Sequence, residues 1–416
     1  MHASSMTAPI SYDDGVDLRA QLRRSQRRQQ LLAFGLVAPL LLFLAINFIT
    51  PIALILKNSV DDRAFSKAAP EVVAALKNWD HESPVPQEAV SALISDLVHA
   101  KGTPRLNAIA SRLNQDVSGY RSLIMSTARR LTEPQPAATL DDLARISPMW
   151  EEAAPWKAIQ RASGPVSSMH LLAALDLQHD VDGNIAKVPP EEAVFLTIFG
   201  RTFWISMIVT ACCLLLGYPV AYLLCTATPR AASIMMLAVL IPFWTALLVR
   251  TSAWVVLLQR EGVVNHFLQW IGVTEAPLEL VFNRTGTYIA LVHVLLPFMI
   301  LPIYSLMKGV SVHTVRAAIS LGSSPFTAFR RVYFPQTIPG VISGCLLVFV
   351  LSIGFYITPA LIGGISDQMI GYFIAHFTTE TANWPMGAAL GGILLLITIM
   401  LLAGLGYLRG RSRTSR

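Results

Sequence analysis

Six long stretches of the chain are built almost entirely from apolar residues, and charged residues fall between them rather than within them. A helix needs about 20 mostly apolar residues to cross about 30 Å of hydrocarbon. All six stretches reach that length, the third most narrowly, since it ends on an arginine. They cover residues 31–56, 202–229, 231–250, 285–307, 332–366 and 381–408. We therefore predict an all-α integral membrane protein with six transmembrane helices.

The composition of the whole chain agrees with this pattern. Of its 416 residues, 53% are hydrophobic and only 14% are charged, whereas soluble domains carry about 25% charged residues. Buried helices of a soluble protein rarely remain uncharged over such lengths. The first stretch is much longer than the roughly 7–15 residues of a signal-peptide core, and no small-residue cleavage pattern follows it. We predict that it is a membrane span rather than a cleaved signal.

Basic residues mark one side of the predicted membrane. Lys and Arg collect at the cytoplasmic ends of spans, and an even number of spans places both ends of the chain on one side. The tails 1–30 and 409–416 are basic, and so is the segment 308–340, which falls on the same side by counting. These basic residues are Arg19, Arg23, Arg24, Arg27, Arg28, Lys308, Arg316, Arg330, Arg331, Arg409, Arg411, Arg413 and Arg416. We predict that all three segments are cytoplasmic.

The segment 57–192 then lies outside, ahead of a core of five spans over 193–408. It holds 14 Lys and Arg against 18 Asp and Glu, a net charge near −4 in a chain of net charge +6. The basic character of the chain therefore reflects its topology and does not indicate nucleic-acid binding. Apolar residues at helical spacing predict a mostly helical domain; they are Leu106, Ile109, Leu113, Val117, Tyr120, Leu123 and Ile124. The domain is either a docking surface for an extracytoplasmic partner or a loop insertion without a separate role.

The sequence contains no catalytic or cofactor-binding constellation. The four cysteines lie in apolar stretches and are typical of small buried residues rather than of disulfides or a metal cluster. The nine histidines show no ligand spacing. No Gly-x-x-x-x-Gly-Lys-Ser/Thr run is present, so the chain has no Walker loop to hold ATP. We predict a protein that is not an enzyme and holds no metal or cofactor itself.

The segment 308–340 predicts two short helices joined by a turn. Gly322 suits a left-handed helix end, and Ser324 with Pro325 suits the start of the next helix. Pro335 and Pro339 are expected to end that helix before the fifth span. Small and apolar residues define the two helix faces: Val312, Val315, Ala318, Ile319 and Gly322 on the first, and Phe326, Phe329 and Val332 on the second. The pair is either a knob that transmits force from a soluble partner or an ordinary loop helix on the membrane surface.

One motif in this segment resembles a family signature. Ala317-Ala318, three residues, Gly322, nine residues and Val332-x-Phe334-Pro335 resemble the cytoplasmic loop of importer permeases of the ABC class. In that family the loop forms a coupling helix that sits in a groove of the ATP-binding subunit. The resemblance implies coupling roles for Arg316, Ala317, Ala318, Gly322, Phe329 and Pro335. Arg316 replaces the usual Glu, which reverses a charge, and Phe334 replaces the usual Leu.

Further segments resemble the first permease of spermidine/putrescine importers. They are Gly217–Tyr222, Ile241–Thr251, Arg260–Asn265, His293–Tyr304 and Thr358–Gly364. The resemblance covers about 31–56 and 195–410 and leaves out 57–192. It implies a polyamine permease of the bacterial inner membrane that works by alternating access in the lipid bilayer. Its implied partners are a dimer of ATP-binding subunits that holds ATP and Mg, a second permease and an extracytoplasmic solute-binding protein.

Polar residues inside the spans are candidates for the solute pathway, because such residues usually face a bundle interior or cavity. They are Trp244, Thr245, Arg250, Asn265, His293 and Tyr304. Arg250 either lines the pathway or reaches the external interface, and His293 is either a packing residue or a solute contact. Trp244 offers an aromatic face for a cationic solute. Trp204, Trp254, Trp270 and Trp384 are expected to anchor the spans at the interface.

Three other functions remain open. The same machine could carry another solute, such as an opine, an aminophosphonate or iron. A secondary transporter would need buried carboxylates and broken helices at the midplane, and the six stretches contain almost no Asp or Glu. A membrane-anchored interaction protein built around 57–192 would leave the cytoplasmic motif unexplained.

Overall fold

The computed structural model describes residues 26, 29–30, 32–81, 83–117, 119–133, 139–180, 184–381 and 383–414, with only the backbone at 405 and 407–414. Most of the predicted tail 1–30 and the side chains of 409–416 lie outside the described residues. The chain divides into two units, Met1–Lys57 and Asn58–Arg416.

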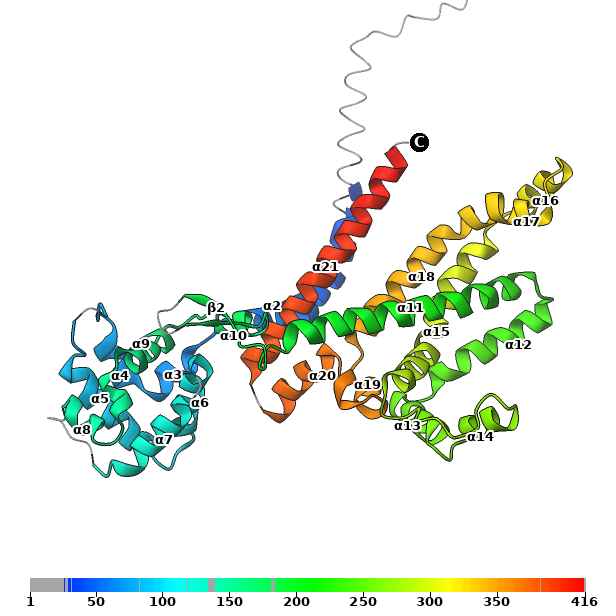
Figure 1. Cartoon of the computed structure of the whole chain (residues 1–416). Helices are drawn as coiled ribbons and strands as arrows, with labels where there is room; N and C mark the ends of the chain where they lie inside the picture. Colours follow the sequence, from blue (N-terminus) through cyan, green and yellow to red (C-terminus); the bar gives the residue numbers. More distant parts are fainter. Residues whose placement is uncertain are drawn as a thin grey trace, which may run out of the picture. The chain divides into compact units, whose positions relative to one another are not determined.

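The described residues are mainly helical, which confirms the all-α prediction (Figure 1). Five helices are long and apolar enough to cross a membrane: Leu32–Asn58, α11 (Phe195–Thr226), α15 (Arg284–Lys308), Pro325–Gly354 and Trp384–Gly404. A sixth candidate is a bent pair, Pro229–Trp244 and Leu247–Trp270, whose two parts meet at 101°. The number of spans is therefore six if the bent pair crosses the membrane once.

The first unit is dominated by the helix Leu32–Asn58, which includes the π turn η1 (Ala45–Ile49) and α2 (Thr50–Asn58). None of the residues in its most apolar window is buried. The amide of Asn47 turns back to the carbonyl of Phe43 at 2.9 Å, so its polar group is satisfied within the helix. An apolar helix with its own polar groups satisfied is suited to a lipid environment.

The insertion before the core is a small helical domain with its own apolar core. Its helices are α3 (Arg63–Ala68), α4 (Pro70–Leu76), α5 (Gln87–Ala100), α6 (Pro104–Asp116), α7 (Tyr120–Arg130), α8 (Leu140–Ala144), η2 (Pro148–Glu151) and α9 (Ala153–Ala162). Trp150 and Trp156 are fully buried, with ring centroids 5.4 Å apart. Ile109 and Leu113 of the predicted helical run are buried in the same core. The prediction of a mostly helical segment is confirmed.

The two ends of this domain lie beside each other. The Asp62 N–H donates to the carbonyl of Pro165 at 3.2 Å, and the Ser167 N–H donates to that of Val60 at 2.9 Å. The chain then forms α10 (Met169–Ala173) and an antiparallel hairpin of β1 (Leu177–His179) and β2 (Ile185–Lys187). The carboxylate of Asp176 accepts hydrogen bonds from the N–H groups of Phe195 and Leu196 at 2.9 and 2.8 Å. These bonds fix the hairpin to the first turn of α11.

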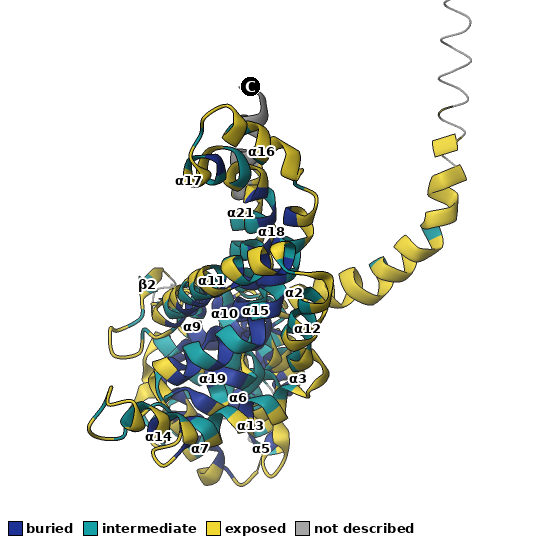
Figure 2. Ribbon diagram, turned by 90° about the vertical axis from the view of Figure 1, so that its right-hand side faces the viewer, coloured by how far each residue is buried: buried dark blue, intermediate teal, exposed yellow. Residues whose placement is uncertain are grey.

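The core is a bundle in which α11, α15 and α18 (Phe334–Gly354) pack against one another, with their shared interior buried (Figure 2). Glycine permits the close approach of α15 and α18. A Cβ atom at Gly340 would lie 2.9 Å from Leu306 Cβ and 3.2 Å from the carbonyl of Pro302. The last helix, α21 (Trp384–Thr414), packs against α10 and α20 (Ile370–Ala375).

Two predicted spans differ from straight helices. The stretch 231–250 breaks into α12 (Pro229–Leu240), η3 (Ile241–Trp244) and α13 (Leu247–Leu258), followed by α14 (Val263–Trp270). Thr245 and Ala246 are extended, with ψ of 139° and 141°, so the helical hydrogen bonds stop there. In the stretch 332–366, the long helix α18 ends at Gly354, and a separate short helix, α19 (Ile357–Ile362), follows it. Both stretches are uniformly apolar, so composition alone did not reveal the breaks.

Candidate functional site

The segment that carries the family motif folds as two short helices beyond the ends of α15 and α18 (Figure 1). They are α16 (Val312–Ser320) and α17 (Pro325–Ala328). Gly322 has a φ of +93° and its N–H donates to the Ile319 carbonyl at 2.9 Å, as predicted for a left-handed helix end. The Ser324 hydroxyl accepts from the Thr327 N–H at 3.3 Å, with Pro325 in the first turn. The local geometry of the predicted helix–turn–helix is confirmed.

This helix pair is exposed and carries positive charge. No residue of α16 is buried, and Figure 2 shows it largely in the colour of exposed residues. Arg316, Ala317 and Gly322 are exposed, and Ala318 is half-buried. Leu321 and Phe326 have 88% and 72% of their surface exposed. No Asp or Glu occurs anywhere from 308 to 366. The surface is thus apolar and basic, although its coupling role stays a prediction.

The second helix runs without a stop into the fifth span, which corrects the prediction that Pro335 and Pro339 end it. A π turn, η4 (Phe329–Tyr333), connects α17 to α18, and the Phe334 N–H donates to the Phe329 carbonyl. Pro335 then occupies the first turn of α18, where the preceding wide turn has already changed the hydrogen-bond pattern. The segment Pro325–Gly354 is therefore one helix.

Aromatic contacts attach the same segment to α11. The ring of Phe329 stacks on Tyr333 with centroids 5.6 Å apart and meets Tyr222 edge-on at 5.7 Å. The hydroxyl groups of Tyr218 and Thr337 lie 3.2 Å apart. A displacement of α17 would therefore shift α11 as well as α18.

The break in the third span brings three predicted pathway residues together. Trp244 has 80% of its surface exposed at the end of η3. The Thr245 hydroxyl donates to the Pro242 carbonyl at 2.9 Å. The guanidinium of Arg250 turns back to the Thr245 carbonyl at 3.0 Å, and its Nε is buried without a hydrogen-bond partner among the described residues. Arg250 therefore lies against the break rather than reaching away from the bundle.

His293 is paired with an aromatic residue of α13. Its Nδ1 accepts a hydrogen bond from Trp254 Nε1 at 3.1 Å, and the two rings meet edge-on. This bond holds Trp254 against α15, and its role as an interfacial anchor stays a prediction. Trp204, Trp270 and Trp384 are exposed, and their anchoring role stays a prediction.

Asn265 and Tyr304 do not belong to the same cluster. Asn265 is buried and joins its side chain to the carbonyls of Gln259 and Leu278 and to the N–H of Leu278, so it shapes an extended loop rather than a pathway. Tyr304 lies 11 residues after His293 on α15, a rise of about 16 Å at 1.5 Å per residue. It lines a separate cavity of about 640 Å³ with Lys308, whose Nζ lies 5.9 Å from the ring centroid.

One ionic contact was missed by the sequence analysis. Arg284 Nε lies 2.8 Å from the carboxylate of Asp367, whose side chain is buried, and Arg201 donates to the carbonyl of Ser366. This contact joins the starts of α11 and α15 to the loop that follows α19. The signal was available, because Asp367 is the sole acidic residue from 280 to 379. A lone carboxylate in such a stretch needs a basic partner.

Similarity to known proteins identifies the family. No protein-family model matches the chain. It is 35% identical over 214 residues to the spermidine/putrescine transport system permease protein PotB of Escherichia coli (strain K12), covering 51% of this chain and 76% of PotB. The chain belongs to the PotB family of ABC importer permeases. PotB of Haemophilus influenzae is 34% identical over 213 residues, covering 50% of this chain and 74% of the relative. Like these PotB permeases, the chain is a transport subunit and a multi-pass inner-membrane protein, not an enzyme.

A solved structure of a bacterial alginate ABC transporter, in complex with an alginate pentasaccharide-bound periplasmic protein, is more distant. Its matching chain is 16% identical, with a TM-score of 0.41, over 52% of this chain and 78% of that one. This likeness is too weak to support a conclusion about cargo or partners. The PotB-like identity therefore rests on the sequence comparison, and about half of this chain lies outside the matched region.

Proposed function

We propose that this chain forms part of the translocation pathway of an ATP-driven polyamine importer. In this proposal both termini are cytoplasmic and the segment 57–192 is periplasmic. A dimer of ATP-binding subunits would hold ATP and Mg, a second homologous permease would complete the pathway, and a solute-binding protein would deliver the cargo. Its similarity to the PotB permeases supports a spermidine- or putrescine-type solute.

The continuous helix from α17 to α18 carries the coupling part of the proposal. An exposed knob with Leu321 and Phe326 at its surface offers apolar contact area, and Arg316 offers a charge to an acidic groove. Because the helix continues from α17 through η4 into α18, a displacement of the α16–α17 pair is transmitted directly to the span. The contacts of Phe329 with Tyr222 and Tyr333 pass the same motion to α11. Such a lever suits alternating access driven from outside the chain.

The broken third span supports the second part of the proposal, which is that this chain contacts the solute. Discontinuous helices in transporters leave backbone groups free to contact a solute near the middle of the membrane. Thr245 and Ala246 form such a break, and the exposed ring of Trp244 lies directly beside it. A desolvated aromatic face attracts an ammonium group by about 2 kcal/mol or more. Trp244 is therefore our candidate for a contact with a polyamine.

Arg250 favours a second candidate cargo with an anionic group. Its guanidinium is the one charged side chain between 231 and 259, and its Nε–H is buried without a partner among the described residues. A carboxylate or phosphonate would satisfy this donor, whereas a polycation would be repelled unless another subunit supplies a carboxylate. An amino acid derivative or aminophosphonate is thus the alternative to a polyamine.

Two measurements test the proposal. The tagged chain, purified from its native membranes in mild detergent, is expected to carry an ATP-binding subunit and a second permease, identified by mass spectrometry. The reconstituted complex should then take up labelled spermidine in an ATP-dependent manner, with unlabelled putrescine competing and an aminophosphonate without effect. Recovery of the chain alone contradicts the importer assembly. Uptake blocked by the aminophosphonate but not by putrescine supports the second cargo.

A further inference from the structure

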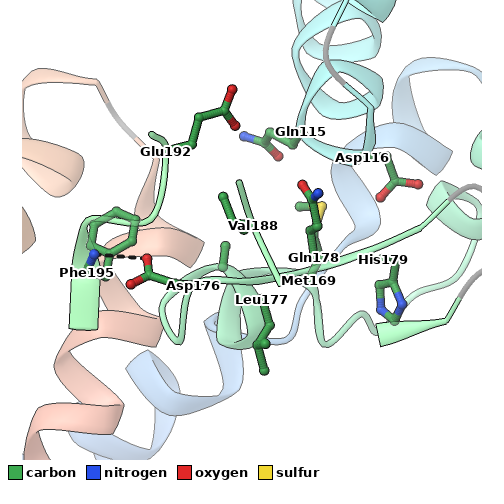
Figure 3. A pocket seen from close by; sticks show the side chains of 11 residues that line it. Gln115, Asp116, Met169, Asp176, Leu177, Gln178, His179, Val188, Glu192 and Phe195 are labelled. Atoms are coloured by element: carbon green, nitrogen blue, oxygen red, sulfur yellow. Dashed lines mark hydrogen bonds between the residues drawn. The ribbon is translucent and has the colours of Figure 1, made fainter. Parts of the chain in front are cut away.

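A small cavity lies where the helical insertion meets the hairpin and the start of α11 (Figure 3). Its volume is about 180 Å³. Figure 3 shows Gln115 and Asp116 entering from one side, from α6, and the residues of the hairpin and of α11 from the other. The lining residues are Gln115, Asp116, Met169, Ala173, Asp176, Leu177, Gln178, His179, Val188, Glu192 and Phe195. The cavity is thus bounded by both the insertion and the first turn of the core.

The polar lining of this cavity is rich in hydrogen-bond acceptors. Three carboxylates and two side-chain amides line it, and no Lys or Arg does. The carboxylate of Glu192 and the amides of Gln115 and Gln178 make no hydrogen bond to any residue that the structure describes. Glu192 and Gln115 both line the cavity, and both are exposed, so its rim is open to solvent at these residues. This rim therefore presents unused acceptors to whatever occupies the cavity.

The two other carboxylates are buried and keep acceptor capacity. Asp176 accepts only the N–H groups of Phe195 and Leu196, and no basic side chain pairs with it among the described residues. Asp116 is held by Arg112 and Arg161 at 3.2 and 3.1 Å. An ionised carboxylate offers about four lone-pair sites, so two bonds leave room for a further donor. A buried charge such as that of Asp176 gains most from an additional positive partner.

Apolar side chains separate these polar groups. Met169, Ala173, Leu177, Val188 and Phe195 supply the remaining walls. A volume of about 180 Å³ is below the roughly 300–1,000 Å³ of sites for drug-sized ligands and far above the roughly 10–15 Å³ that a single water needs. A ligand must therefore be small, partly aliphatic and a hydrogen-bond donor.

We propose that this cavity binds a small aliphatic diamine, separately from the translocation pathway. One ammonium group pairs with Glu192 and Gln115, the second approaches Asp176, and the methylene chain lies against Leu177 and Val188. An anion is disfavoured because three carboxylates line the cavity against a single imidazole, that of His179, and no Lys or Arg. A metal ion is disfavoured because no group of three or more His, Cys, Asp or Glu side chains in the described residues is arranged to hold one.

Occupation of the cavity has a structural consequence. The ligand would join α6 of the insertion to the hairpin and to the residues that precede α11. Among the described residues Asp176 bonds the start of the hairpin to α11, whereas the ion pair of Asp116 with Arg161 joins α6 only to α9 within the insertion. A bound diamine would therefore reduce local opening of the segment 169–196, which carries the insertion's attachment to the core.

Hydrogen exchange of the purified, detergent-solubilised complex tests this proposal, with 1,4-diaminobutane as the probe and 1,4-butanediol as a neutral probe of equal length. The diamine is expected to slow exchange in 169–196, and the diol is not. Glu192→Gln, which keeps an acceptor but removes the charge, should weaken the concentration dependence of this protection by at least about tenfold. Glu191→Gln is the matched control, because Glu191 is exposed like Glu192 but does not line the cavity.

Each alternative result has a defined meaning. Equal protection by the diol, or unchanged diamine protection in Glu192→Gln, overturns the assignment. Protection by Mg²⁺ but not by the diamine overturns it in favour of a metal ion. Protection by the diamine confined to 241–250 and 285–307 supports the pathway described above and overturns this second site. Failure of the importer assembly itself leaves protection at 169–196 as an independent result, so the two proposals are tested separately.

Discussion

Arg112 forms a bidentate ion pair with Asp62, although 50 residues separate them in the sequence. Arg112 Nε lies 2.7 Å from Asp62 Oδ1 and Nη2 lies 2.5 Å from Oδ2, with both side chains almost fully buried. Asp62 precedes α3 at the beginning of the insertion and Arg112 lies on α6. The pair therefore connects the point where the chain enters the domain to one of its central helices.

Removal of this arginine is expected to destabilise the insertion strongly. In Arg112→Met the carboxylate of Asp62 remains buried without its partner, while Asp116 keeps its contact with Arg161 at 3.1 Å. Breaking a buried pair in this way costs about 3–5 kcal/mol. The thermal unfolding transition of the purified protein, followed by the fluorescence of buried Trp150 and Trp156, should move to lower temperature. Unchanged unfolding would show that the pair contributes nothing.

Two controls separate burial from charge. Arg145 lies 3.8 Å from Asp142 but its side chain is 81% exposed, so Arg145→Met should cost no more than about 1 kcal/mol. The double variant Asp62→Asn with Arg112→Met should lose less than Arg112→Met alone, because it leaves one fewer buried charge unpaired. A double variant that is less stable than the single one would contradict this account.

The stability of the insertion is expected to depend on pH through Asp96. Burial raises the pKa of this carboxyl from 3.8 to about 6, while its hydrogen bond from the Val72 N–H at 2.9 Å opposes the shift. Because the folded state holds the proton more tightly than the unfolded state, this group stabilises the fold at low pH. That contribution is lost as the pH rises from about 4 to about 6 and is constant above that range.

Asp96→Asn removes this titration but keeps an oxygen that accepts the Val72 N–H. Relative to the unmodified protein, the variant should gain unfolding temperature between pH 4.5 and pH 7.5. His170, whose pKa burial lowers to about 4, acts in the opposite direction in both proteins and cancels in the comparison. A difference between the two proteins that does not change with pH would show that Asp96 does not titrate in this range.

Local chemistry made the helix ends predictable, whereas the interruptions within apolar stretches were not. Gly322 and Ser324 were found because left-handed backbone and capping hydroxyls act within a few residues. The break at Thr245 and Ala246 has no such signal, since apolar residues continue on both sides. Proline is an ambiguous marker here: Pro242 lies beside the break, yet Pro297 is inside the continuous helix α15.

The candidate site was predicted where its parts are adjacent in sequence and missed where folding joins distant residues. The helix pair around Gly322 follows from 20 or so consecutive positions. The pairing of Trp254 with His293, and that of Arg284 with Asp367, spans 39 and 83 residues. Such contacts depend on how α13, α15 and the loop after α19 pack, and hydrophobic patterning does not specify that arrangement.

A side chain at Gly322 is expected to uncouple transport from ATP hydrolysis. Nothing lies within 4 Å of a Cβ atom at this position, so the effect is conformational rather than steric. An ordinary L-residue at a φ of +93° costs roughly 1–2 kcal/mol, enough to shift a two-state population about 5- to 30-fold. Gly322→Val should insert normally but reduce uptake per ATP hydrolysed in proteoliposomes. Undiminished uptake would remove the coupling assignment.

Matched substitutions show whether backbone conformation is the cause. Gly322→Asn should retain most uptake, because Asn tolerates the left-handed region, which a β-branched residue such as Val rarely adopts. Gly309 ends α15 with a φ of −81°, so Gly309→Ala should have little effect. Equal losses in the Val and Asn variants would instead indicate that this surface requires the absence of any side chain.

Trp244 provides the test of the pathway itself. If its ring holds an ammonium group of the cargo at the broken span, Trp244→Ala should lower the uptake rate at low solute concentration about tenfold or more, while ATPase activity and membrane insertion remain. Trp244→Phe keeps a weaker aromatic face, so its uptake rate should lie between those of the unmodified protein and Trp244→Ala. Trp270 is the control, because it is equally exposed, at 81%, but lies on α14 away from the break. Normal transport by Trp244→Ala would exclude this contact, because alanine has no aromatic ring that could hold the ammonium group.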